Sequence, residues 1–129
     1  MAVQLNHTIV NSHDSVASAR FMSDVFGLPE PTVFGPFQVI EAANGVSLDF
    51  IDVGDDGVVH AQHYAFLVAE DEFDSIFARV VERGLDYWAD PGHSQPGRIN
   101  HHYGGRGVYF DSPDGHFLEI ITTPYGSEP

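Results

Sequence analysis

Residues 106–122 read RGVYFDSPDGHFLEIIT and contain two runs of β-branched and aromatic side chains, at 108–110 and 117–122. The sequence Ser-Pro-Asp-Gly between these runs is typical of a turn, because proline presets its own φ and glycine accepts a positive φ. The stretch therefore predicts two strands that pair as a hairpin.

Glu119 is the unusual residue of the second predicted strand. It lies between Leu118 and Ile120, and its neighbours on its own face of the strand are Phe117 and Ile121. A buried carboxylate is costly unless a cation or a set of hydrogen-bond donors compensates for the lost water. The chain has five arginines and no lysine, so the predicted partner is an arginine, a histidine cluster or a metal ion.

The length of 129 residues is that of one compact domain. We expect a single domain over 1–129, with a first module at 1–53, a linker at 54–57 and a second module at 58–123. No apolar run approaches the roughly 18 residues of a membrane span, and the first ten residues lack a basic region followed by an apolar one. The sequence therefore predicts a soluble, cytoplasmic protein with no membrane partner.

Charge and cysteine content limit the function. The formal net charge of -14 argues against binding to nucleic acid, because phosphates would be repelled along most of the surface. The absence of cysteine excludes disulfides, thiolate metal sites and cysteine nucleophiles. A metal site would have to use nitrogen and oxygen ligands, and small molecules are the expected binding partners.

The first half of the chain predicts one strand, one helix and a hairpin. A strand at 4–10 places Leu5, His7 and Ile9 on one face, and a helix follows at 14–26. Strands are then predicted at 37–43 and 46–53, joined by Asn44-Gly45, which is a strong hairpin signal. A further strand at 31–34 is only weakly indicated.

The second half repeats this order. A strand at 58–68 is followed by a helix that begins at the acidic residues 70–72 and ends at Gly84. A strand at 86–89 is weakly indicated. The loop at 90–97, rich in proline and glycine, is expected to form a wall or lid beside a site.

The two halves are an internal duplication. Residues 44–51 (NGVSLDFI) align with 114–121 (DGHFLEII), so Asp49 corresponds to Glu119. His7 in the first strand of one half corresponds to His63 in the first strand of the other. Two histidines and two carboxylates therefore occupy equivalent positions.

Paired βαβββ modules with a histidine in the first strand and an acid in the last resemble the vicinal oxygen chelate superfamily. This superfamily includes glyoxalase I, extradiol dioxygenases, fosfomycin-resistance thiol transferases and bleomycin-resistance proteins. The resemblance implies an α+β fold in which two modules form a bent eight-stranded mixed sheet around a cleft, with the helices on the outer face. It also implies a homodimer, with the modules paired within one chain or across two.

The resemblance assigns metal ligands residue by residue. It implies that His7, His63 and Glu119 bind a divalent ion, and that Asp49 is a fourth ligand, either directly or through water. Two imidazoles and a carboxylate suit Fe, Mn, Ni or Zn and leave positions open for a substrate.

Other polar residues are candidates for catalysis beside Glu119. His102 and Tyr103 precede the hairpin, where they are predicted to reach the mouth of the pocket and where an imidazole can act as acid, base or hydrogen-bond donor. Their alternative is an ordinary position in a surface loop. Arg98 and Arg106 are able to orient a carboxylate or phosphate, but we expect them to pair with surface acids.

Two functions are consistent with these features. The first is a metal-dependent lyase, epimerase or ring-cleaving dioxygenase acting on a small substrate chelated through vicinal oxygens. Fosfomycin transfer is disfavoured, since residues 120–129 contain no basic side chain to hold a phosphonate. The alternative is a non-catalytic protein of the bleomycin-resistance type that sequesters a cationic or aromatic compound such as an antibiotic.

Overall fold

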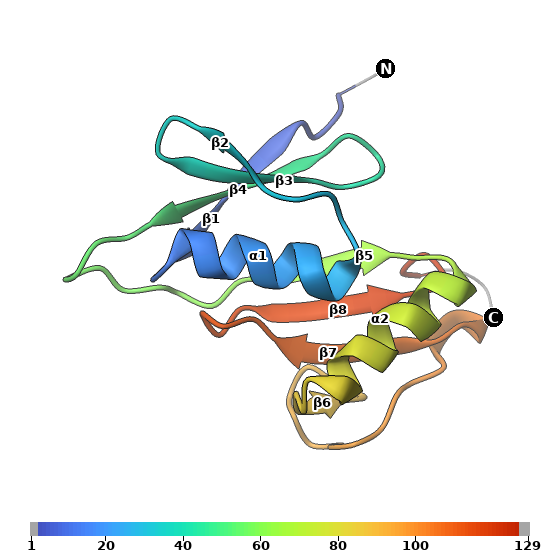
Figure 1. Cartoon of the computed structure of the whole chain (residues 1–129). Coiled ribbons are helices and arrows are strands. Elements are labelled where there is room, and N and C mark those ends of the chain that lie inside the picture. Colours follow the sequence, from blue (N-terminus) through green and yellow to red (C-terminus); the bar gives the residue numbers. More distant parts are fainter. Residues whose placement is uncertain (1–2, 127–129) are drawn as a thin grey trace. The chain divides into compact units, whose positions relative to one another are not determined.

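The computed structural model describes residues 3–126, and the chain divides into two compact units between His60 and Ala61. Residues 1–2 and 127–129 of the expected domain lie outside the described residues. Each unit contains one helix and four strands in the order strand, helix, three strands (Figure 1). The predicted α+β class and the two βαβββ modules are confirmed.

Unit 1 is a four-stranded mixed sheet covered by one helix. Its strands lie in the order β1-β4-β3-β2, with β1 parallel to β4 and the other pairs antiparallel. The elements are β1 (His7–Ser12), α1 (Ser15–Phe26), β2 (Thr32–Phe34), β3 (Phe37–Glu41) and β4 (Ser47–Asp52).

Helix α1 begins and ends where the sequence predicts. The Asp14 side chain accepts a hydrogen bond from the Ala17 backbone N–H at 3.1 Å, and Gly27 closes the helix with φ of 69°. The helix contacts β1, β3 and β4. Its apolar side chains and those of one sheet face form the core of unit 1, which comprises Val10, Ala19, Met22, Val25, Phe26, Ile40, Leu48 and Phe50.

Unit 2 repeats the topology with strand order β5-β8-β7-β6 and a parallel β5–β8 pair. Its elements are β5 (His63–Leu67), α2 (Glu70–Glu82), β6 (Tyr87–Trp88), the short 3-10 turn η1 (His102–Gly104), β7 (Gly107–Asp111) and β8 (Phe117–Ile121). The weakly indicated strands β2 and β6 are thereby confirmed, and both are short.

Helix α2 covers one face of the unit 2 sheet. Phe77 packs edge-on against Tyr87 with ring centroids 4.9 Å apart, and Tyr87 pairs with Phe110 of β7. The buried side chains on this face are Phe73, Ile76, Val80, Val108, Phe110, Leu118 and Ile120. Because side chains alternate along a strand, Tyr109 and Glu119 lie on the opposite face, away from α2.

The first strand of each unit begins later than the sequence predicts. The strand predicted at 58–68 is formed only over His63–Leu67, because its partner β8 begins at Phe117, opposite His63. Likewise β1 begins at His7, opposite the first residue of β4, rather than at residue 4, and it continues to Ser12. In both cases the available ladder partner, rather than local propensity, sets the limit of the strand.

Neither α1 nor α2 could span a membrane. Within residues 3–126 no helix is both long and apolar enough to do so.

Candidate active site

Glu119 and His63 form the centre of the candidate site. Glu119 is only 5% exposed, and its Oε1 lies 2.8 Å from Nε2 of His63. Parallel pairing sets Ala65 beside Glu119 and His63 beside Phe117, so His63 and Glu119 are diagonal neighbours on one face of adjacent strands. Of the partners considered from the sequence, the structure thus gives the buried carboxylate a histidine.

Tyr109 is a third member of this cluster that the sequence analysis missed. It lies directly opposite Glu119 in the antiparallel β7–β8 pair, and its ring centroid is 5.8 Å from that of His63. Burial, a hydrogen bond to Glu119 and the negative charge of Glu119 all raise the pKa of Tyr109. The phenol therefore stays protonated at neutral pH and donates to the carboxylate. The hairpin register, counted from the predicted turn, was the signal that could have found it.

A cavity of about 260 Å³ opens beside this cluster within unit 2. Its walls are mostly aromatic or polar, and Tyr103 and Tyr125 lie with ring centroids 5.6 Å apart. The predicted residues His102, Tyr103 and Glu119 all line it. The full lining is Pro91, Asn100, His102, Tyr103, Arg106, Tyr109, Glu119, Ile121, Thr123 and Tyr125.

Asn100 fixes the segment that carries His102 and Tyr103. Its side chain donates to the Ala89 carbonyl at 2.9 Å and accepts from the His102 backbone N–H at 3.2 Å. Tyr103 then adopts φ of 57°, in the left-handed region that few non-glycine residues occupy. The two side chains are thus held at the cavity by a specific local structure and not by a loose loop.

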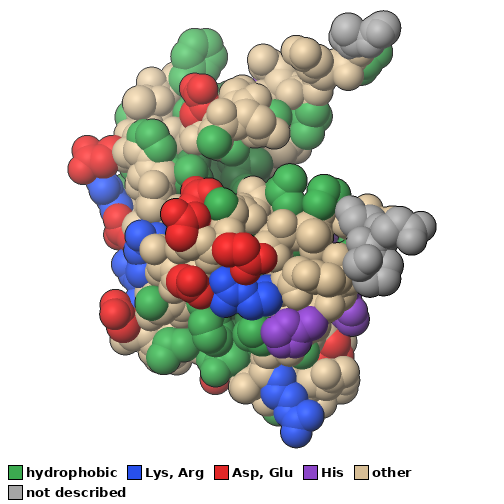
Figure 2. All heavy atoms as spheres, turned by 90° about the vertical axis from the view of Figure 1, so that its right-hand side faces the viewer, with side chains coloured by type: hydrophobic (Ala, Val, Ile, Leu, Met, Phe, Trp, Pro, Cys, Tyr) green, Lys and Arg blue, Asp and Glu red, His purple; other side chains and the backbone are tan. Residues whose placement is uncertain are grey.

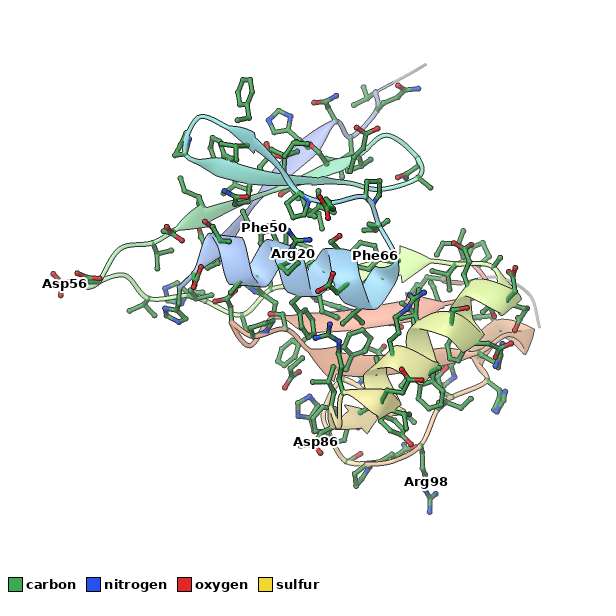
Figure 3. The ribbon with its side chains drawn as sticks, viewed as in Figure 1. Arg20, Phe50, Asp56, Phe66, Asp86 and Arg98 are labelled. Carbon is green, nitrogen blue, oxygen red and sulfur yellow. The ribbon has the colours of Figure 1, made fainter. Side chains whose placement is uncertain are left out.

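Arg106 is committed to helix α2. Its Nε and Nη1 each donate at 2.8 Å, to Glu70 and Asp74 respectively, and its guanidinium lies 4.3 Å from the centroid of the Phe73 ring. Asp74, together with Glu70, raises the pKa of Arg106. The expected pairing with surface acids is confirmed for this arginine, and Figure 2 shows basic side chains lying among acidic ones on one face of the protein. Arg98 is exposed and projects from its loop (Figure 3).

His7 and Asp49 hold the equivalent positions in unit 1. Parallel pairing sets Ile9 beside Asp49, as it sets Ala65 beside Glu119. Nδ1 of His7 lies 2.7 Å from the side-chain oxygen of Asn6, and the Ser47 hydroxyl donates to Asp49 at 3.0 Å. The duplication is therefore matched in register, but the histidine and the acid of unit 1 have separate partners.

Two side chains of unit 2, His63 and Glu119, are of the kinds that bind divalent metals. An imidazole nitrogen and a carboxylate oxygen from adjacent strands are ligands that Fe, Mn, Ni and Zn accept. Over residues 3–126, no group of three histidine, aspartate or glutamate side chains is gathered at one point. The structure brings His63 and Glu119 together, while His7 and Asp49 belong to the other unit.

The chain is similar to two solved oxidases over nearly its whole length. It is 61% identical to oxidase ChaP-H1, covering 98% of this chain and all of that one with a TM-score of 0.93. It is 59% identical to oxidase ChaP-H2, covering all of both chains with a TM-score of 0.95.

A more distant similarity points to the same group of folds. The fosfomycin resistance protein FosX from Mesorhizobium loti is 20% identical with a TM-score of 0.69, over 97% of this chain and 96% of that one. The metallothiol transferase FosB of Shouchella clausii (strain KSM-K16) is 35% identical over 60 residues, which is 46% of this chain. The chain covers 37% of that curated relative.

A family model settles the assignment. Residues 4–120 match the model described as the glyoxalase/bleomycin resistance protein/dioxygenase superfamily. This range contains the helices of both units, all their strands except the last residue of β8, and the His63–Tyr109–Glu119 cluster. The chain belongs to the glyoxalase/bleomycin resistance protein/dioxygenase superfamily.

Proposed function

We propose that the protein is a metal-dependent oxidase that acts on a small substrate bound in the unit 2 cavity through two adjacent oxygens. The observation that carries this proposal is the carboxylate of Glu119, which lines that cavity and is paired with His63. The two ChaP oxidases, each about 60% identical over the whole chain, favour oxidative chemistry over the lyase and epimerase reactions of the superfamily.

His63 and Glu119 are the proposed ligands of the ion in unit 2. His7 completes the set, and Asp49 is a fourth ligand or binds through water, from the same chain or from the partner subunit of a homodimer. Fe or Mn suits an oxidase better than Zn, because a redox-active ion bound there would supply electrons to oxygen and polarise the substrate oxygens. A monomer in light scattering at micromolar concentration would count against the homodimer.

The surrounding side chains have separate proposed roles. The protonated hydroxyl of Tyr109 donates a hydrogen bond to Glu119 and so holds the carboxylate in one orientation. His102 and Tyr103 lie at the cavity, where His102 is placed to move a proton to or from the substrate. Tyr103 and Tyr125 offer ring faces to an aromatic substrate.

The engagement of Arg106 argues against a phosphonate substrate. Arg106 lines the cavity, but its Nε and Nη1 atoms already donate to Glu70 and Asp74. A phosphonate substrate would have to compete with two carboxylates for this guanidinium. The likeness to FosB, which covers less than half of the chain, therefore does not carry fosfomycin transfer to this protein.

The test is oxygen uptake by untagged protein that has been stripped of metal and reloaded in turn with Fe(II), Mn(II), Ni(II) or Zn(II). The substrates would be a panel of catechols and hydroxyquinones, which carry vicinal oxygens. We expect uptake only with a redox-active ion, and its loss in Glu119→Gln but not in His60→Asn, which changes an exposed histidine outside the strands. Tight binding of a cationic drug by metal-free protein, with no uptake for any ion, would support the sequestering function instead.

A further inference from the structure

The turn that follows β6 has a stiff internal structure. The carboxylate of Asp90 accepts hydrogen bonds from the Ser94 backbone at 3.0 Å, the Ser94 hydroxyl at 2.6 Å and the Gln95 backbone at 2.8 Å. The base of the turn is closed by backbone bonds from Ala89 to Gln95 and from Gly97 to Tyr87. Residues 90–95, named here the Asp90 turn, are therefore preformed.

One side chain of this turn, His93, reaches back to the sheet. Its ring is stacked on Trp88 with centroids 3.6 Å apart and planes within 5°, and it meets the Phe117 ring edge-on at 5.9 Å. Its Nε2 lies 3.4 Å from Oδ1 of Asp111, a buried oxygen without a hydrogen-bond partner among the described residues. His93 thus makes one contact with each of β6, β7 and β8.

The backbone conformation of His93 is energetically unfavourable. His93 has φ of 60°, one of two positive values at non-glycine residues in the described part of the chain. A residue other than glycine is unfavourable in the left-handed region unless other contacts hold it there. Here the stacked indole and the Asp111 oxygen are the contacts that compensate.

The Asp90 turn also forms part of the cavity wall. Pro91 lies two residues before His93 and lines the cavity together with Tyr109 and Glu119. The contacts of His93 with Trp88, Asp111 and Phe117 fix where the Asp90 turn lies on the sheet. Because the turn is stiff, they also fix the position of Pro91. We propose that His93 is a positioning residue that seats this wall of the substrate cavity. The proposal rests on the proposed function only in taking this cavity as the substrate site.

Two substitutions distinguish the contribution of the His93 ring from that of its backbone conformation. His93→Asn removes the ring but keeps a residue that tolerates the left-handed conformation, whereas His93→Phe keeps a ring to stack on Trp88. His60→Asn is the matched control. The chain has a single tryptophan, so its fluorescence reports the stack directly.

The binding test uses 4-nitrocatechol as a coloured probe with vicinal oxygens, added to Mn(II)-loaded protein of full length. We expect His93→Asn to weaken probe binding about fivefold and to shift the Trp88 emission, because an aromatic pair that seats the wall is lost. His93→Phe should recover part of the probe affinity, because it restores the stack on Trp88 but not the contact of Nε2 with Asp111. Mn(II) affinity should stay the same in every variant, since His63 and Glu119 are not altered.

Specific results would overturn the positioning role. If the Trp88 emission shifts in His93→Asn but probe affinity is unchanged, the His93–Trp88 stack does not position the cavity wall. A His93→Phe variant as weak as His93→Asn would exclude the ring as the seating element. If the unchanged protein does not bind 4-nitrocatechol, the proposed function fails, and amide hydrogen exchange of residues 90–97 then decides the inference: it must accelerate in His93→Asn and recover in His93→Phe.

Discussion

The carboxylate of Glu119 has a polar partner on each of the two neighbouring strands. His63 approaches one carboxylate oxygen from β5, and the Tyr109 hydroxyl donates from β7. A lone carboxylate at this depth would be strongly unfavourable, but two polar partners on the same sheet face offset its desolvation. The same arrangement leaves an imidazole nitrogen and a carboxylate oxygen side by side.

The role of Tyr109 is tested by Tyr109→Phe. Removing the hydroxyl leaves the Glu119 carboxylate free to reorient, and groups that orient a metal ligand change affinity by about tenfold or more. We therefore expect titration calorimetry to give an Mn(II) affinity about tenfold weaker than that of the unchanged protein. Tyr87→Phe is the control, because Tyr87 lies on the α2 face of the sheet. Equal Mn(II) affinity in both variants would contradict the role of the Tyr109 hydroxyl.

At the scale of elements, the sequence predicted both helices and six of the eight strands from local signals, whereas the local signals for β2 and β6 were weak. Asp14 and Gly27 mark the ends of α1, and Ser-Pro-Asp-Gly marks the turn between β7 and β8. The limits of β1 and β5 were not local, since each begins only where its partner strand begins. The site was predicted in part for the same reason. Glu119 is recognisable from its apolar neighbours in the sequence, whereas its contacts with Tyr109 and His63 depend on pairing between strands.

The link between β7 and α2 is tested by Arg106→Met. This change removes the charged hydrogen bonds to Glu70 and Asp74 while keeping an apolar side chain near Phe73. We expect the melting temperature to fall by a few degrees, because these pairs are solvent-exposed and individually weak. Arg98→Met is the control, since Arg98 projects from its loop (Figure 3). The link would be refuted by equal melting temperatures for the two variants.

The Asp90 turn gives a prediction about pH. The Ser94 hydroxyl, with backbone donors of Ser94 and Gln95, lowers the pKa of Asp90 below its ordinary value of 3.8. A lowered pKa stabilises the fold fully above that ordinary value, and the contribution is lost as pH falls through the folded value. Hydrogen exchange at the Ser94 and Gln95 amides should therefore be slow at pH 6 and accelerate, relative to the intrinsic rate, at lower pH. Asp90→Asn should already be fast at pH 6, and a pH-independent protection equal in both proteins would contradict this account.

At the scale of the whole molecule, duplication explains why the sequence already indicated a metal site. Equivalent register in the two units places His7 and Asp49 where the other unit has His63 and Glu119. The units have nevertheless diverged, since Asp49 is one methylene shorter and accepts a hydrogen bond from Ser47. The net charge of -14 also favours cation binding in general, but it does not choose the ion.

Removal of metal should destabilise the whole protein. An ion bound only by the native state adds RT ln(1 + [L]/Kd), which is about 2.7 kcal/mol when the free ion is at a hundred times Kd. EDTA should therefore lower the melting temperature of metal-loaded protein at pH 7 in thermal denaturation. Superimposed melting curves with and without EDTA, on protein shown to contain metal, would contradict a site that stabilises the fold.

Elemental analysis of untagged protein tests most directly the proposal that Glu119 and His63 hold a functional metal ion. Protein reloaded with Mn(II) and dialysed should retain about one ion per chain, because each chain has one site that contains His63 and Glu119. Glu119→Gln should lose most of it, because replacing a charged ligand with a neutral one weakens affinity by about tenfold or more. Absence of metal from the unsubstituted protein, or equal metal content in the two proteins, would show that Glu119 does not hold a metal ion.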